Sequence, residues 1–395
     1  MKIYFKNINI VDVINGNILE NRGMIVENSI IKKITESNYE INEKLDLITD
    51  LKNSYIMPGI IDCHVHVFND ATGKMNFFKD KNNHVAVIAT AIKNLESLLK
   101  SGVTYIRDLG AIKGFDIQLR ELVKKGYILG PDIKCCGQFI TMTGGHMYTI
   151  GKEVDGVEEV RKAARESIKM GADVIKLAAS GGVITAGNDI NAYQFNEDEL
   201  RVAVIEGHKA NKKVATHSHS AQAIRNSILA GVDSIEHGSL IDDECIDLMV
   251  KKDIFLVPTL KVGYSIIKAF ESGKKSITEE MYEKEKFLTS KRGKNLEKAY
   301  KKGVKIAMGT DSGVVGNIFG KNYEELFLMK ECSIPIEDVI KIATINAAEL
   351  LNIKESHGSI EEGKVADFLV LKENPYKNLE TIKDLISVYK NGKLV

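Results

Sequence analysis

The sequence between residues 58 and 358 alternates strand-like and helix-like patterns eight times. Short apolar runs rich in β-branched residues predict buried strands, and intervening segments such as 85–100, 157–170 and 197–210 predict helices. The predicted strands are 60–67, 103–109, 132–140, 174–179, 214–218, 234–237, 254–260 and 304–310. Eight such units predict an α/β fold, a (β/α)8 TIM barrel with its active site at the carboxyl ends of the strands. An open doubly wound sheet is the alternative, but no Gly-x-Gly-x-x-Gly motif follows the first strand.

Both ends of the chain have a different pattern. Short alternating runs separated by turn signals such as Asn15-Gly16 and Asn391-Gly392 predict strands without helices between them. We therefore expect residues 1–57 and 359–395 to pair into one small β-sandwich domain. Residues 58–358 are expected to form the barrel, and 395 residues are enough for both parts.

Two histidines lie on the first predicted barrel strand, within Ile60-Ile61-Asp62-Cys63-His64-Val65-His66. Alternate residues of a strand point to the same side, so His64 and His66 form a pair of candidate metal ligands near the strand's carboxyl end. The structural alternative is two core histidines satisfied by backbone carbonyls. The pair alone does not decide between these interpretations.

Further candidates occur at the ends of other predicted strands. The fifth strand contains Thr216-His217-Ser218-His219, the sixth contains Glu236-His237, and Asp311 follows the eighth. Because the carboxyl ends of barrel strands converge, we expect His64, His66, Lys176, His217, His237 and Asp311 to meet in one metal site. Each residue also has a structural explanation of its own, but the recurrence at equivalent positions favours the site.

Lys176 needs a separate explanation because it interrupts the apolar run of the fourth strand, Val174-Ile175-Lys176-Leu177. Burying an unpaired ammonium is unfavourable. Either a carboxylate pairs with the lysine inside the barrel, or a neutral amine has reacted with carbon dioxide. The resulting carbamate could bridge two metal ions as a carboxylate does.

Taken together, these motifs resemble the amidohydrolase superfamily over essentially the whole chain. The matching segments are Met57-Pro58-Gly59 with His64 and His66, Val174-Ile175-Lys176, His217, Ser234-Ile235-Glu236-His237, Gly309-Thr310-Asp311 and Gly363-Lys364-Val365-Ala366-Asp367. The resemblance implies two divalent metal ions, usually zinc. His64 and His66 would hold the first ion, His217 and His237 the second, and carboxylated Lys176 would bridge them. Asp311 would bind the first ion and transfer protons.

Two loop segments resemble a particular group within the superfamily. Thr143-Gly144-Gly145-His146 and Ala179-Ser180-Gly181-Gly182-Val183 are similar to the zinc-dependent dipeptidases and carboxypeptidases of the Xaa-Pro and Xaa-Arg/Lys types, with imidazolonepropionase-like proteins nearby. This resemblance implies a dipeptide or N-acyl amino acid as substrate and release of a C-terminal amino acid. His146 and His219 would donate a hydrogen bond to the oxyanion or to a substrate carboxylate; a structural role is the alternative for both.

Two other functions stay open at this point. One is a cyclic amidase or deaminase on the same scaffold, and the other is a non-catalytic metal-binding protein. The complete set of candidate ligands argues against the second. A formal net charge of zero gives no reason to expect nucleic acid or an anionic membrane as a partner.

The remaining expectations concern the surroundings of the enzyme. No apolar run is long enough to cross a bilayer or to resemble a signal peptide, so we expect a cytoplasmic protein. We also expect a homo-oligomer. The charged segment 264–302 predicts one or two exposed helices with a solvated face, and a lid or an oligomer contact is the functional alternative.

Overall fold

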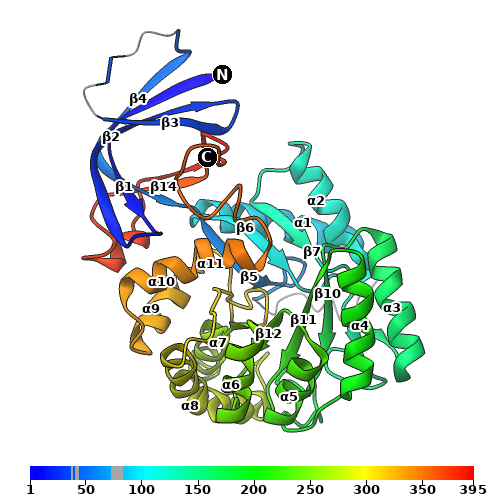
Figure 1. The fold of residues 1–395 in the computed structure, drawn as a ribbon. Helices are drawn as coiled ribbons and strands as arrows, with labels where there is room; N and C mark the ends of the chain where they lie inside the picture. The colour runs from blue at the N-terminus through cyan, green and yellow to red at the C-terminus, as the bar shows by residue number, and fades with distance from the viewer. Residues whose placement is uncertain (37–38, 41–43, 73–82) are drawn as a thin grey trace.

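The computed structural model describes residues 1–36, 39–40, 44–72 and 83–395. Strands from the two chain ends lie side by side in one part of the molecule, drawn in blue and red in Figure 1. The middle of the chain forms the other part, in which strands are surrounded by helices. The chain therefore has an α/β fold, and among the described residues no helix is both long and apolar enough to cross a membrane.

The chain ends share one seven-stranded sheet with the order β16-β15-β14-β4-β1-β2-β3. Its strands are β1 (Lys2–Asp12), β2 (Asn17–Glu27), β3 (Ile30–Glu36), β4 (Leu47–Pro58), β14 (Phe368–Leu371), β15 (Ser387–Lys390) and β16 (Lys393–Leu394). Phe5, Phe368 and Tyr389 pack their rings together, with centroids 4.7–5.2 Å apart. This apolar contact joins the two ends of the chain.

The middle of the chain contains two further sheets. One has the order β5-β6-β7 and the other the order β13-β12-β11-β10-β8-β9, with parallel pairing throughout. Their strands are β5 (Ile60–Val65), β6 (Val103–Asp108), β7 (Asp132–Cys135), β8 (Ile140–Thr141), β9 (Lys152–Glu153), β10 (Val174–Ala178), β11 (Lys213–Ser218), β12 (Ser234–His237) and β13 (Phe255–Val257). Every residue of β5, β6, β10 and β12 is buried, including the polar residues that interrupt their apolar sequences.

Backbone hydrogen bonds connect these two sheets at both edges. Asp173, just before β10, donates to Cys135 of β7 at 2.7 Å. On the other side, Ala307 donates to Leu256 of β13 at 3.1 Å, and Cys63 of β5 donates to Met308 at 2.8 Å. The segment 304–310 thus lies between β13 and β5.

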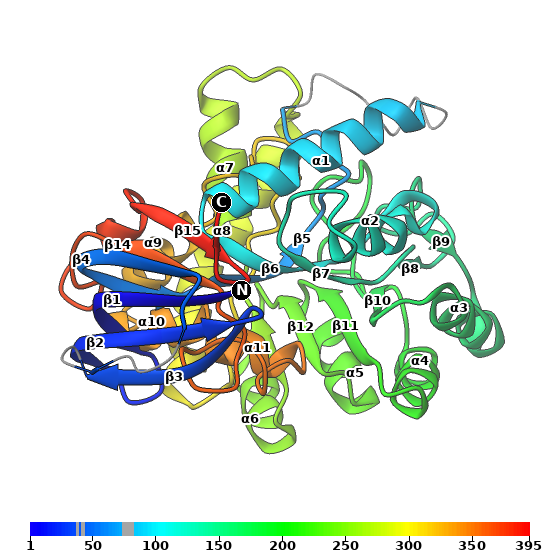
Figure 2. The same ribbon diagram turned by 90° about the horizontal axis from the view of Figure 1, so that it is seen from above.

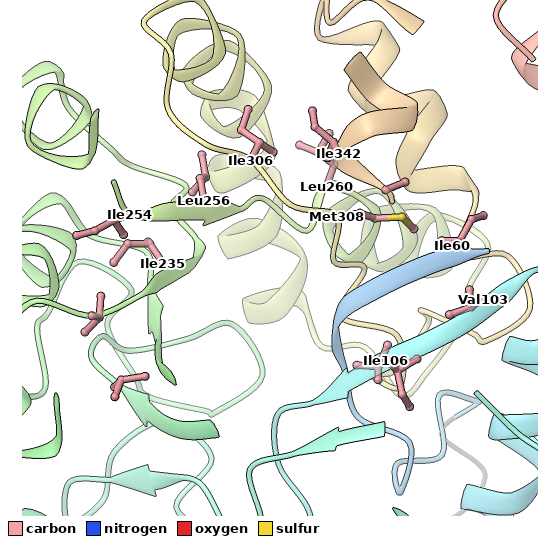
Figure 3. Packing of buried hydrophobic residues seen from close by; sticks show 14 of the residues in the cluster. Ile60, Val103, Ile106, Ile235, Ile254, Leu256, Leu260, Ile306, Met308 and Ile342 are labelled. Carbon is pink, nitrogen blue, oxygen red and sulfur yellow. The ribbon is translucent and has the colours of Figure 1, made fainter. Parts of the chain in front are cut away.

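Helices cover the outside of these strands. Figures 1 and 2 place α3, α4, α5 and α6 along the outer side of β10, β11 and β12. The helices are α1 (His84–Lys100), α2 (Phe115–Lys124), α3 (Gly156–Met170), α4 (Glu197–Lys209), α5 (Ala221–Ala230), α6 (Asp243–Lys252), α7 (Leu260–Glu271), α8 (Glu279–Lys301), α9 (Glu324–Glu331), α10 (Ile336–Ile342) and α11 (Ile345–Leu350), with 3₁₀ turns at Ile112–Gly114 and Leu379–Ile382. Figure 3 shows how strand residues such as Ile106 and Leu256 and helix residues such as Ile342 contribute to the buried apolar core.

Several predicted elements agree closely with the structure, and three differ. The helices predicted at 85–100, 157–170 and 197–210 correspond to α1, α3 and α4. The predicted strand 132–140 is interrupted after Cys135, where Gly137 has a φ of 73°. The strand predicted at 254–260 stops at Val257, because Pro258 follows and α7 begins at Leu260. Segment 304–310 forms only an isolated bridge, between Ile306 and Leu256, in place of a regular strand.

The charged segment forms two helices, most of α7 and all of α8, as predicted. Most charged side chains of α8 are exposed to solvent, but two of them are buried. Glu285 and Arg292 of α8 are only 2% exposed and form an ion pair directed into the protein. The charged pattern concealed this pair because the surrounding lysines and glutamates are exposed.

Candidate active site

One cavity brings all the predicted site residues together. It is lined by His64, His66, His146, Lys176, His217, His219, His237 and Asp311. They come from β5, β10, β11 and β12 and from loops that follow strands. The convergence expected from strand-end positions is therefore present.

The first group of potential ligands is His64, His66 and Asp311. Asp311 Oδ1 lies 3.5 Å from His64 Nε2 and 3.2 Å from His66 Nε2, without hydrogen-bond geometry. His66 Nδ1 is also buried without a partner among the described residues. Nitrogen and carboxylate atoms that face one another in this way fit a divalent cation such as zinc.

The second group consists of His217, His219 and His237, whose nearest ring nitrogens lie within 4.8 Å of one another. The ring centroids of His217 and His237 are 4.5 Å apart, and those of His219 and His237 are 4.8 Å apart. Proximity alone therefore places His219 in this group, although the sequence analysis assigned it to substrate contact. The distances do not tell ligand from hydrogen-bond donor.

Lys176 lies in the same cavity and is 5% exposed. Its Nζ has no hydrogen-bond partner among the described residues, which disfavours the interpretation of a lysine paired with a carboxylate. Burial lowers the pKa of this amine to about 8. The neutral form that reacts with carbon dioxide is thus more accessible than in an exposed lysine, and an unpaired buried amine fits a carbamate.

A buried hydrogen-bond network orients His64 from behind. Glu236 Oε2 lies 2.9 Å from His64 Nδ1, and Arg107 Nη2 donates to Glu236 Oε1 at 2.8 Å. Burial by itself raises the pKa of Glu236, but Arg107 and Lys176 hold it below its usual range. The carboxylate is therefore charged and accepts the proton of Nδ1, which leaves Nε2 free to coordinate a cation. Sequence reasoning missed Glu236 and Arg107 in this role, although both interrupt buried strands as Lys176 does.

Two site residues have backbone conformations that are unusual for residues other than glycine. His237 has a φ of 71° and Asp311 a φ of 57°. Such positions are unfavourable unless the surroundings hold them, and they occur often at functional sites. Each of them directs a side chain into the cavity at the end of a strand.

His146 and His219 contact the rings of the candidate metal ligands. The ring of His146 stacks on His217 with a centroid distance of 4.2 Å, and its Nδ1 lies 3.2 Å from Thr185 Oγ1. His219 Nδ1 lies 3.0 Å from Ser239 Oγ. Burial lowers the pKa of His146 to about 3 and that of His219 well below its usual range, so both imidazoles are neutral at pH 7.

The rest of the cavity wall is mainly apolar. Its apolar members are Leu109, Phe139, Met147, Ala178, Val183, Ile184, Val262, Ile266 and Val314. The ion pair of Glu285 and Arg292 completes the wall on the side of α8. Glu285 and Arg292 have no sequence motif around them, and only the packing of α8 against the strand ends brings them to the cavity.

Comparison with known proteins gives a consistent picture. The sequence pattern of the Amidohydrolase family matches residues 55–395. Ochratoxinase from Aspergillus niger is 30% identical over 413 aligned residues, which cover 96% of this chain and 84% of the relative. A crystal structure of a Xaa-Pro dipeptidase with methionine bound in its active site has a TM-score of 0.92 and 31% identity, with all of both chains covered. Imidazolonepropionase from Clostridium tetani is 23% identical over 97% of this chain and 93% of the relative.

Proposed function

We propose that this chain, which belongs to the amidohydrolase family, is a metal-dependent hydrolase that cleaves a dipeptide or an N-acyl amino acid and releases the C-terminal amino acid. The family assignment makes it a hydrolase acting on carbon–nitrogen bonds. One observation carries the finer proposal. Six histidines and Asp311 line one cavity together with the unpaired amine of Lys176, and the rest of the cavity wall is mainly apolar.

The scaffold that we infer is a closed (β/α)8 barrel spanning residues 58–358. The hydrogen bonds of Asp173, Ala307 and Cys63 support closure, because they join the two parallel sheets at both edges. The shared sheet of the chain ends supports a β-sandwich domain formed by 1–57 and 359–395. A cytoplasmic location and a homo-oligomer stay predictions.

Two divalent cations such as zinc fit the donor atoms of the cavity. His64, His66 and Asp311 would hold one, His217 and His237 the other, and carboxylated Lys176 would bridge them. When bound, such cations lower the pKa of water toward about 7 and polarise the scissile carbonyl. The unpaired atoms of Lys176, His66 and Asp311 support this assignment.

The residues of the chain would then carry out the proton transfers. Asp311 accepts a proton from the attacking water and returns it to the leaving nitrogen as the carbon–nitrogen bond breaks. His146 and His219 donate hydrogen bonds to the carbonyl oxygen, where negative charge develops, or to the carboxylate of the substrate. Burial keeps water away from these donors and strengthens their interactions.

The cavity wall favours an apolar amino acid over a basic one as the released product. Val183, Ile184, Val262 and Ile266 offer apolar contact. The acidic side chain of Glu285 is already paired with Arg292 at 2.9 Å, so a substrate lysine or arginine would find no free carboxylate there. The dipeptidase structure with methionine bound in its active site is compatible with this preference.

A cyclic amidase or deaminase is the second candidate. It is favoured by full-length relatives named imidazolonepropionase and 5-methylthioadenosine/S-adenosylhomocysteine deaminase, at 23% and 21% identity. A non-catalytic protein is disfavoured by the complete set of ligand candidates.

A substrate panel tests the proposal. Protein reconstituted with zinc and bicarbonate would be assayed for amino acid release from N-acetyl-phenylalanine, N-acetyl-methionine and N-acetyl-lysine, from Xaa-Pro and Xaa-Phe dipeptides, and from their C-terminal amides. We expect release from the apolar free acids, with the amides and the lysine compound cleaved more slowly. Equal cleavage of acids and amides would contradict release of a C-terminal amino acid. Activity confined to cyclic amides or amino-purines would favour the second candidate.

A further inference from the structure

His219 and His146 could each act either as a metal ligand or as a hydrogen-bond donor to the substrate. Both rings contact the ring of the candidate ligand His217. The nearest ring nitrogens of His217, His219 and His237 lie within 4.8 Å of one another, so His219 is close enough to be a third ligand. A neutral imidazole has one nitrogen with a proton and one with a lone pair. Whether it donates a hydrogen bond or binds a cation through Nε2 depends on which nitrogen carries the proton.

We propose that two buried hydroxyl groups, those of Ser239 and Thr185, fix the proton of His219 and of His146 on Nε2. These two rings then face the substrate as hydrogen-bond donors and are excluded as metal ligands. Only the catalytic consequence of this inference rests on the proposed function. The position of the protons follows from the hydrogen bonds of the chain itself.

The case for His219 begins with Arg292 of α8. Arg292 Nε donates to Ser239 Oγ at 3.0 Å, and a guanidinium cannot accept a hydrogen bond. Ser239 Oγ lies 3.0 Å from His219 Nδ1, and Ser239 is fully buried. If His219 Nδ1 also donated, the hydroxyl proton would stay buried without an acceptor among the described residues, which is unfavourable. Ser239 therefore donates to Nδ1, and the ring proton is on Nε2.

Arg292 is itself held in place on its other sides. Its Nη1 donates to the carbonyl of Thr259 at 3.2 Å, and its Nη2 lies 2.9 Å from Glu285 Oε1. Arg292 on α8 is therefore a positively charged side chain that is not a ligand of either proposed metal ion. It acts through Ser239, which makes Arg292 and Ser239 positioning residues.

An independent copy of the same arrangement acts on His146. The backbone N–H of Met147 donates to Thr185 Oγ1 at 2.9 Å, and this oxygen lies 3.2 Å from His146 Nδ1. A backbone N–H, like a guanidinium, can only donate. The hydroxyl proton of Thr185 is therefore directed to His146 Nδ1, and His146 also carries its proton on Nε2.

Two of the candidate ligands, His64 and His217, have the opposite kind of partner. His64 Nδ1 faces the carboxylate of Glu236 at 2.9 Å, and His217 Nε2 faces the carbonyl of Gly181 at 3.4 Å. Both partners only accept, so each ring keeps a lone pair on its other nitrogen. Thr259 Oγ1, 2.7 Å from His237 Nδ1, receives no N–H donor among the described residues and is free to accept. For His64 and His217, the acceptor partner thus distinguishes the candidate ligand from the two proposed donors.

The test is the tautomer of each ring in protein labelled with ¹⁵N-histidine. Long-range ¹H–¹⁵N correlation of the metal-free protein distinguishes Nδ1–H from Nε2–H, and single histidine substitutions assign the signals. We expect Nε2–H for His146 and His219 in the wild type. Ser239→Ala should release only His219 into a mixture of tautomers, and Thr185→Val should release only His146. Ser239→Thr, which keeps the hydroxyl, should preserve the wild-type signal of His219.

Each variant is the control for the other, and the wild-type spectrum stands even if one variant fails to fold. Nδ1–H signals for either ring in the wild type, or an unchanged His219 tautomer in folded Ser239→Ala, would overturn the inference. The spectra do not depend on any substrate, so failure of the proposed function would leave them unaffected. If that function holds, kcat of Ser239→Ala should fall on the order of tenfold, with KM and metal content unchanged and activity restored in Ser239→Thr.

Discussion

The two sides of the cavity are built in different ways. On one side, His64, Glu236 and Arg107 lie on the buried strands β5, β12 and β6. On the other side, His146 and His219 depend on Thr185, Ser239 and Arg292, which come from loops and from α8. The first side holds candidate metal ligands and the second holds candidate substrate contacts. Chemistry common to a whole family can rest on the strands, while specificity can change with loops and inserted helices.

This comparison predicts that substitutions on the strand side remove metal and activity together. Lys176→Ala is expected to have the largest effect, with loss of most activity and of at least one metal equivalent while the fold is kept. Metal analysis after reconstitution and circular dichroism measure both. Lys134→Ala, on the partly exposed strand β7, is a matched control and should retain metal and activity.

The same variant can break the carbamate assignment. If Lys176 acts as a carbamate, acetate or propionate should partly restore metal binding to Lys176→Ala by filling the place of the missing carboxylate. A wild-type protein that never binds more than one metal equivalent would contradict the bridged pair of ions. Full activity in Lys176→Ala would return the lysine to a structural role.

Asp311→Asn should separate metal binding from proton transfer. The amide cannot accept the proton of the attacking water, so kcat should fall on the order of 10²–10⁴-fold. Most of the metal should stay bound, because the histidines and Lys176 are intact. Single-turnover kinetics of metal-loaded protein would measure the effect, and a kcat near that of the wild type would exclude Asp311 from proton transfer.

The two sides also differ in how well the sequence predicts them. His64, His66, His217 and His237 could be found because strand periodicity fixes their direction and barrel topology fixes their end of the sheet. Lys176 could be found because a lysine within an apolar strand is unusual. Glu236 and Arg107 gave the same signal, and it could have been read as an internal pair that supports a ligand.

Arg292 and Glu285 could not be predicted in this way. They lie in a helix with many exposed charges, and only the tertiary contact of α8 with the strand ends buries them. The same limit explains the segment 304–310, whose apolar residues predict a strand. Backbone hydrogen bonds join Lys305 and Ala307 to Leu256 on one side and Met308 to Cys63 on the other, and the segment forms no regular ladder. The apolar pattern of this segment correctly indicates burial. Whether the segment also forms a β-ladder depends on neighbouring strands that are distant in the sequence.

On the α8 side, the ion pair should matter for stability more than for metal binding. Arg292→Met leaves Glu285 buried without its partner, and breaking a buried pair in this way costs about 3–5 kcal/mol of unfolding free energy. The double variant Arg292→Met/Glu285→Leu should recover most of that loss, while metal content stays near the wild-type value. Denaturant unfolding of the single and double variants measures this. Equal destabilisation by both would show that the pair itself is not the cause.

The smallest expected effect lies outside both sides of the cavity, on the outer helix layer. Glu206 of α4 accepts hydrogen bonds from Arg165 at 3.0 Å and from Arg161 at 3.1 Å on α3. The hydrogen bond from Arg165 is the main cause that lowers the pKa of Glu206, to about 2 from an ordinary value of 4.5. A carboxylate whose pKa is lower in the folded state than in the unfolded state stabilises the fold above its unfolded pKa. This stabilisation is lost as the pH falls toward the folded pKa.

Glu206→Gln should therefore lower Tm at pH 7, and the difference from wild type should shrink between pH 4.5 and pH 2. Because Arg165 is 59% exposed, salt should also reduce the difference. Thermal melts of EDTA-treated proteins keep metal loss out of the comparison, and a difference in Tm that persists at pH 2 would assign the effect to packing instead of charge.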